Sequence, residues 1–89
     1  MAGKTELTSL KNIGPAMAQW LKQAGITTPK QLHELGAVEC YLRISKLHRN
    51  AANRMALYAL YGAIHDINCL KLAPEIKDML NGMVEDAKN

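Results

Sequence analysis

The chain contains no Phe and few aromatic residues of any kind, which make up 4% of its 89 residues. Its two cysteines, Cys40 and Cys69, form no CxxC pair, so a dense disulfide framework is excluded. No apolar run suits a signal peptide or approaches the length of a membrane-spanning helix. These absences predict a cytoplasmic protein with reduced thiols and no membrane partner.

Catalytic signatures are missing as well. No Ser/His/Asp arrangement, glycine-rich phosphate loop or pair of catalytic carboxylates stands out. His65 and Cys69 have a spacing that suits two ligands on one helix face, and Cys40 with His48 would complete a zinc set. No ligand spacing recurs, however, as it does in most zinc sites. We therefore expect no enzyme, no metal and no cofactor.

Helix-forming residues dominate what is present. Hydrophobic residues make up 48% of the chain and charged residues 21%, a balance typical of a folded globule, and Leu, Ala, Met, Lys and Gln prevail. The length suits one domain. We predict an all-α fold of five or six short helices in a single domain over residues 1–89. Its core should run from about 7 to 80, with flexible ends at 1–5 and 86–89.

Prolines, glycines and apolar spacing predict the helix boundaries. After a short first helix that ends near Leu10, the expected helices cover residues 15–24, 29–35, 37–47, 50–67 and a last segment from Pro74. Thr28 should cap the second of these, and Gly25 should end the one before it. The helix over 50–67 is apolar on several sides, so we expect it to be central.

Residues 7–21 resemble the helix-hairpin-helix motif, in which two short helices pack across a tight turn. The matching positions are Leu7, Leu10, Ile13, Gly14, Ala18 and Leu21. Two positions differ, because Asn12 replaces the first glycine and Lys22 replaces a closing apolar residue. Asn tolerates positive φ better than most residues, so the turn can form. The motif predicts a compact helix-hairpin-helix or SAM-like bundle.

The hairpin also predicts an anion site, because a helix N-terminus offers free N–H groups and the positive end of the helix dipole. The expected nucleic-acid contacts are the N–H groups of Ile13, Gly14 and Ala16, the side chain of Asn12, and the charges of Lys11 and Lys22. Residues 1–54 hold eight basic and three acidic residues, whereas residues 55–89 hold three and five. Binding should be independent of sequence and sensitive to salt. In the alternative interpretation, the motif only connects two packed helices.

Other polar and aromatic residues are weaker candidates for a binding site. The basic stretch of Lys46, His48, Arg49 and Arg54, with Asn50 and Asn53, suits either an anion or a solvated loop with an Asn N-cap. Tyr58 and Tyr61 lie on the central helix and are expected to pack in the core with their hydroxyls at the surface. Trp20 suits either an interhelical position or an exposed contact.

A longer similarity covers roughly residues 7–80. It is carried by Leu10-x-Asn12-Ile13-Gly14-Pro15, Trp20-Leu21-x-x-Ala24-Gly25-Ile26-x-Thr28, Leu32-x-x-Leu35-Gly36-Ala37-Val38-Glu39-x-Tyr41 and Leu57-Tyr58-Ala59-Leu60-x-Gly62-Ala63-Ile64. These segments resemble the C-terminal domain of the TfoX (Sxy) proteins. The resemblance implies an all-helical domain and an association with the regulation of competence for DNA uptake. Full family members also carry an N-terminal α/β domain, to which nothing in these residues corresponds.

Two functions from different classes follow. The first is weak DNA binding through the hairpin backbone. The second is a protein-interaction or dimerisation module that binds no nucleic acid, with an adaptable surface supplied by Met17, Met55, Met79 and Met83.

Overall fold

A computed structural model describes residues 7–49 and 53–88, and the regular elements in these ranges are all helical. The prediction of an all-α fold is confirmed. In chain order the elements are η2 (Leu7–Ser9), α1 (Pro15–Gln23), α2 (Pro29–Leu35), α3 (Ala37–Leu47), α4 (Arg54–His65), η4 (Cys69–Lys71) and α5 (Pro74–Lys88). Within the same ranges, no helix is long and apolar enough to span a membrane.

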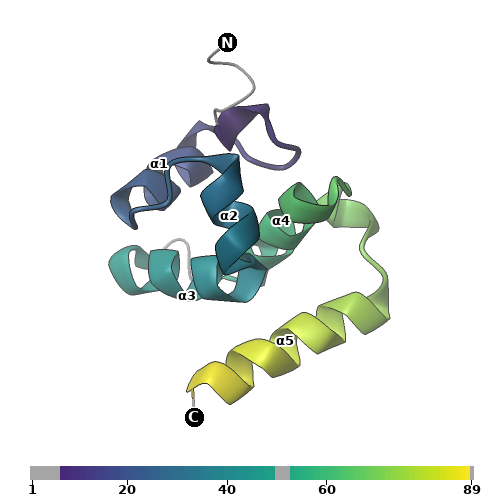
Figure 1. Cartoon of the computed structure of the whole chain (residues 1–89). Coiled ribbons are helices and arrows are strands. Elements are labelled where there is room, and N and C mark those ends of the chain that lie inside the picture. The colour runs from purple at the N-terminus through teal and green to yellow at the C-terminus, as the bar shows by residue number, and fades with distance from the viewer. Residues whose placement is uncertain (1–6, 50–52, 89) are drawn as a thin grey trace.

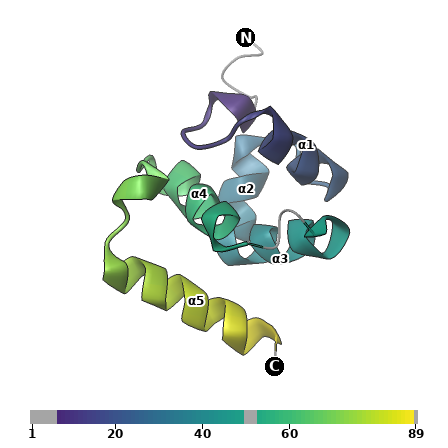
Figure 2. The same ribbon diagram turned by 180° about the vertical axis from the view of Figure 1, so that it is seen from behind.

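The helices form a layered arrangement (Figures 1 and 2). α3 and α4 lie side by side in the middle, with α1 and the η2 turn on one side and α5 on the other. α2 connects α1 to α3 and packs against α3. The turn between η2 and α1 lies next to the C-terminal end of α4 in both views. The hairpin and α5 therefore occupy opposite ends of the molecule.

The ends of α1 and α2 follow the signals in the sequence. Gly25 has a φ of 86° and, with Ile26, closes α1 by two backbone bonds, from Gly25 N to Lys22 O (3.0 Å) and from Ile26 N to Leu21 O (2.8 Å). At the start of α2, the hydroxyl of Thr28 accepts from Gln31 N at 3.2 Å, and Gln31 Oε1 accepts from Thr28 N at 3.2 Å. Both predicted boundaries are confirmed.

α4 is shorter than predicted. Asn53 Oδ1 accepts from Ala56 N at 3.0 Å, so this side chain caps the helix three residues after its expected start. At the other end Asp66 adopts a left-handed conformation (φ 57°), which ends the helix before Ile67. Apolar spacing alone could not reveal either end, because it continues past both.

One hydrophobic core draws on all five α-helices, and α4 is central to it, as predicted. The largest fully buried side chains are Leu21, Ile26, Leu32, Cys40, Ile44, Leu57, Leu60, Leu80 and Val84. Packing thus reaches Val84, beyond the expected limit near residue 80. Met55, which is expected to belong to an adaptable surface, is 49% exposed.

Polar contacts join α5 to α4 beside this core. Arg54 Nη2 donates to Glu85 Oε2 at 2.8 Å, and Asn81 Nδ2 donates to the hydroxyl of Tyr58 at 3.1 Å. Lys77 Nζ lies 5.5 Å from the centre of the Tyr58 ring. The body of Tyr58 therefore packs between helices while its hydroxyl reaches a polar partner, as expected.

Candidate nucleic-acid interface at the hairpin

The start of α1 is an open helix N-terminus. Gly14 is the N-cap residue, no side chain caps the helix, and the first turn contains no acidic residue. Gly14 and Ala16 are exposed, and across the described ranges 7–49 and 53–88 their N–H groups have no acceptor. The first bond of the helix runs from Ala18 N to Gly14 O at 3.0 Å. These two N–H groups can therefore donate to an anion from solvent.

Ile13 does not contribute its N–H group as predicted. This group donates to Leu10 O at 3.3 Å and so closes the turn, while the side chain is 5% exposed and packs in the core. The predicted donor set of three residues is reduced to Gly14 and Ala16.

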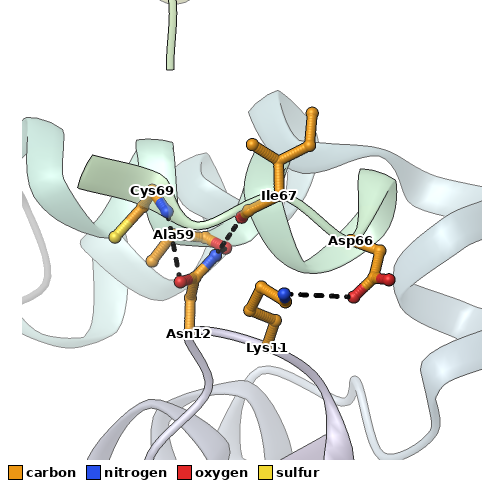
Figure 3. A network of polar contacts seen from close by, with 6 residues as sticks. All are labelled: Lys11, Asn12, Ala59, Asp66, Ile67 and Cys69. Carbon is orange, nitrogen blue, oxygen red and sulfur yellow. Dashed lines mark hydrogen bonds and ion pairs between the residues drawn. The ribbon is translucent and has the colours of Figure 1, made fainter. Parts of the chain in front are cut away.

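Asn12 has a φ of 72°, which confirms that Asn takes the positive-φ position of the turn. Its side chain does not lie at the hairpin tip, contrary to prediction, but points into the fold (Figure 3). Asn12 Nδ2 donates to Ile67 O at 2.8 Å and to Ala59 O at 3.5 Å, and Asn12 Oδ1 accepts from Cys69 N at 3.2 Å. Its amide is thus engaged by backbone groups and not offered to a ligand.

Gly62 provides the space that Asn12 occupies. A Cβ atom at Gly62 would overlap Asn12 Nδ2 and Ile67 O, whereas Ile67 N donates to Gly62 O at 2.8 Å. This role of Gly62 was not predicted from the sequence. A single glycine within a strongly apolar helix could have indicated it, because such a glycine often marks close packing. The contacts of Asn12 with backbone groups at 59, 67 and 69 could not be predicted from the types of these residues.

Lys11 lies beside the turn and close to an acidic side chain. Its Nζ is 3.9 Å from Asp66 Oδ1, and the two side chains are 47% and 87% exposed. Exposed pairs of this kind contribute about 0–1 kcal/mol, so Lys11 can turn toward another anion. Asp66 nevertheless adds negative charge close to the predicted phosphate position.

Lys22 is exposed and lies near the other end of α1. It follows Pro15 by seven residues, which at about 1.5 Å per residue places it roughly 10 Å further along the axis. Contrary to the prediction, Lys22 therefore lies too far along α1 to contact the same phosphate as the N–H group of Gly14.

Four of the remaining candidates, Trp20, His48, Asn53 and Arg54, form structural contacts. Trp20 is half-buried and stacks on His48, with ring centres 6.1 Å apart and planes inclined by 28°. Arg54 pairs with Glu85, and Asn53 caps α4, as the loop interpretation expected. Asn50 lies outside the described residues.

The four residues considered for zinc are not brought together. Wherever the structure is described, no three His, Cys, Asp or Glu residues lie close enough to hold a metal ion. Both cysteines are free. Cys40 is fully buried in α3, and its burial raises the pKa of the thiol to about 11. The charge of Arg43 lowers this pKa and that of Glu39 raises it, both by smaller amounts.

Comparisons with known proteins give a family but no activity. The family model of the TfoX C-terminal domain matches residues 3–84. An uncharacterized protein from Listeria monocytogenes, solved in a triclinic crystal form, is 34% identical over 93% of both chains, with a TM-score of 0.81. A protein of unknown function from the same organism, solved in a tetragonal form, is 34% identical over 89% of this chain and 96% of that one, with a TM-score of 0.79. No curated protein of known function matches the chain.

Proposed function

The chain belongs to the TfoX C-terminal domain family, and on this premise we propose that it is a non-enzymatic module that binds DNA weakly and without sequence preference. The observation that carries the proposal is the exposed, uncapped start of α1, where the N–H groups of Gly14 and Ala16 lack acceptors among the described residues. DNA phosphates are the anions that such backbone donors suit.

The charge around the hairpin supports the same ligand. Lys11 lies next to the turn, and Lys22 lies in the last turn of α1. Few phosphates are contacted in this way, so affinity should be low and should fall with salt. Any role in the regulation of competence, which the family resemblance implies, would depend on this contact with DNA. The two free cysteines favour a reducing cytoplasmic location.

The proposal is tested by charge reversal at the turn. Labelled duplex and single-stranded DNA are titrated with the wild-type protein and with Gly14→Glu at low and moderate salt. We expect Gly14→Glu to weaken binding about tenfold at low salt, because the carboxylate occupies and repels the phosphate position. A Cβ atom at Gly14 meets no atom within 4 Å, so the fold should persist, as circular dichroism can verify.

Gly82→Glu is the matched control. Gly82 lies on α5 at the far end of the molecule, and a Cβ there also meets nothing within 4 Å. The two variants change the net charge equally. Equal losses in both, or no binding of wild-type protein at low salt, would contradict a phosphate site at the hairpin.

Removing the acidic neighbour should have the opposite effect. Asp66→Asn keeps a residue that tolerates the left-handed conformation of this position and removes the charge beside Lys11. We expect DNA affinity to rise about threefold at low salt, in proportion to a weak exposed ion pair. The same titration measures it, with Asp78→Asn on α5 as control. A similar rise in both variants would show that only net charge matters.

A groove at the opposite end of the molecule supports a second candidate function, the binding of a protein. A groove of about 350 Å³ lies between α4, α5 and the start of α3, and the exposed Met79 and Met83 line it beside Tyr61. Such a surface suits a protein partner or a second copy of the chain. Met17 does not belong to it, contrary to prediction, because its side chain is buried in the core. A mass that rises with concentration, together with no DNA binding at low salt, would favour this function.

A further inference from the structure

We propose that Asn12 is the positioning residue of the hairpin anion site. Held by α4 and the segment that follows it, its side chain sets the direction in which the N–H groups of Gly14 and Ala16 point. This inference rests on the proposed DNA binding and adds the residue that determines the geometry of that site.

A short stretch of backbone joins Asn12 to the two donor N–H groups. Only Ile13 separates Asn12 from Gly14, and the buried side chain of Ile13 leaves this residue little freedom. Pro15 then fixes its own φ at the start of α1. The orientation of the Asn12 backbone therefore largely determines the direction in which the two free N–H groups point.

Several long-range hydrogen bonds hold the side chain of Asn12. Its amide contacts backbone groups of Ala59, Ile67 and Cys69, which are 47 to 57 residues away along the chain. Figure 3 shows the side chain reaching from the hairpin turn to the end of α4 and the start of η4. One side chain thus joins the turn to a distant part of the fold.

The hydrogen-bond partners of Asn12 are themselves held in place. Ala59 is buried within α4, and Ile67 is held by the bond from its N–H group to Gly62 O. Asn68 Oδ1 accepts from Leu70 N at 2.9 Å and shapes the turn that carries Cys69. The groups around Asn12 are therefore fixed well enough to hold its side chain in one orientation.

Asn suits this position of the turn better than Gly or Asp. Glycine, the usual residue at this position of the motif, would accept the φ of 72° but provide no anchor. Asp would keep the acceptor for Cys69 N but place a carboxylate against the carbonyl oxygens of Ala59 and Ile67. Asn supplies both the backbone conformation and the correct donors, so its presence links turn geometry to the body of the fold.

Asn12→Gly is the decisive variant, because it preserves net charge and positive φ and removes only the anchor. We expect its affinity for labelled duplex DNA at low salt to fall about fivefold. In ¹⁵N relaxation, the order parameters of the Gly14 and Ala16 N–H groups should fall from about 0.85 toward 0.6. Titration with sulfate should shift these two amide signals less than in the wild-type protein.

Asn53→Gly is the matched control, since it removes the N-cap of α4 at the end of that helix that lies away from the hairpin. It should leave DNA affinity and both order parameters unchanged, even where it lowers stability. If Asn12→Gly binds DNA as well as the wild-type protein and keeps its order parameters, the positioning role is overturned.

Failure of the proposed function has a different signature. If wild-type protein binds neither DNA nor sulfate, the site is lost, and the order parameters alone then decide whether Asn12 positions the turn. Should Asn12→Gly not fold, Asn12→Asp replaces it in the relaxation measurement. Unchanged order at Gly14 and Ala16 in that variant overturns the inference.

Discussion

Replacing Gly62 with alanine should lower the free energy of unfolding by about 3 kcal/mol, which combines overpacking with the loss of hydrogen bonds made by the Asn12 side chain. The new methyl group would overlap Asn12 Nδ2 and the carbonyl oxygen of Ile67, and the latter belongs to the backbone and has little room to move. The substitution therefore separates the hairpin turn from the end of α4. Urea denaturation followed by circular dichroism at 222 nm measures the change.

Gly82→Ala is the control, with the opposite sign expected. Gly82 also lies inside a helix, but a Cβ there meets no atom within 4 Å. Alanine should raise the stability of α5 by about 0.5–1 kcal/mol, since it loses less backbone entropy on folding. If both alanine variants are more stable than the wild-type protein, the close packing of Gly62 against Asn12 is wrong.

Leu80→Ala should destabilise the protein by about 3 kcal/mol, within the range of leucine truncations in closely packed cores. Leu80 lies on α5 and is 2% exposed, so its removal leaves a cavity between α5 and the rest of the core. The free energy of unfolding, obtained from the same denaturation curves, reports the loss.

Met79→Ala provides the comparison for this second variant. Met79 is the neighbouring residue on α5 and is 45% exposed, so its truncation should change stability by less than about 0.5 kcal/mol. Equal effects at the two positions would mean that α5 does not pack on the core through Leu80. A large loss at Leu80 alone would establish α5 as an integral part of the domain.

Local sequence signals were sufficient for most of the fold. Pro15, Pro29 and Pro74 begin α-helices, and Gly25 and Gly36 follow the ends of α1 and α2. These signals act within a few residues, so they can be read without knowledge of the fold. The ends of α4 were misjudged because they depend on which of several Asn and Asp residues adopts a capping conformation.

The candidate site was only partly predictable for a related reason. The open N-terminus of α1 follows from Gly14 and Pro15, which are adjacent in the sequence. The engagement of Asn12 by residues 59, 67 and 69 depends on backbone carbonyl and N–H groups, which every residue type provides. Residue patterns carry little information about such partners, and the proximity of Asp66 to Lys11 was hidden for the same reason.

The separation of the hairpin from α5 has a practical consequence for biophysical assays. Asp86 is exposed on α5, and a cysteine introduced there, with the half-buried free Cys69 replaced by serine, could carry a dye or couple the protein to a sensor chip. Because α3 and α4 lie between this helix and the hairpin, the attached group would face away from an approaching oligonucleotide. Tethering through Asp86 would thus present the hairpin uniformly toward the flowing analyte.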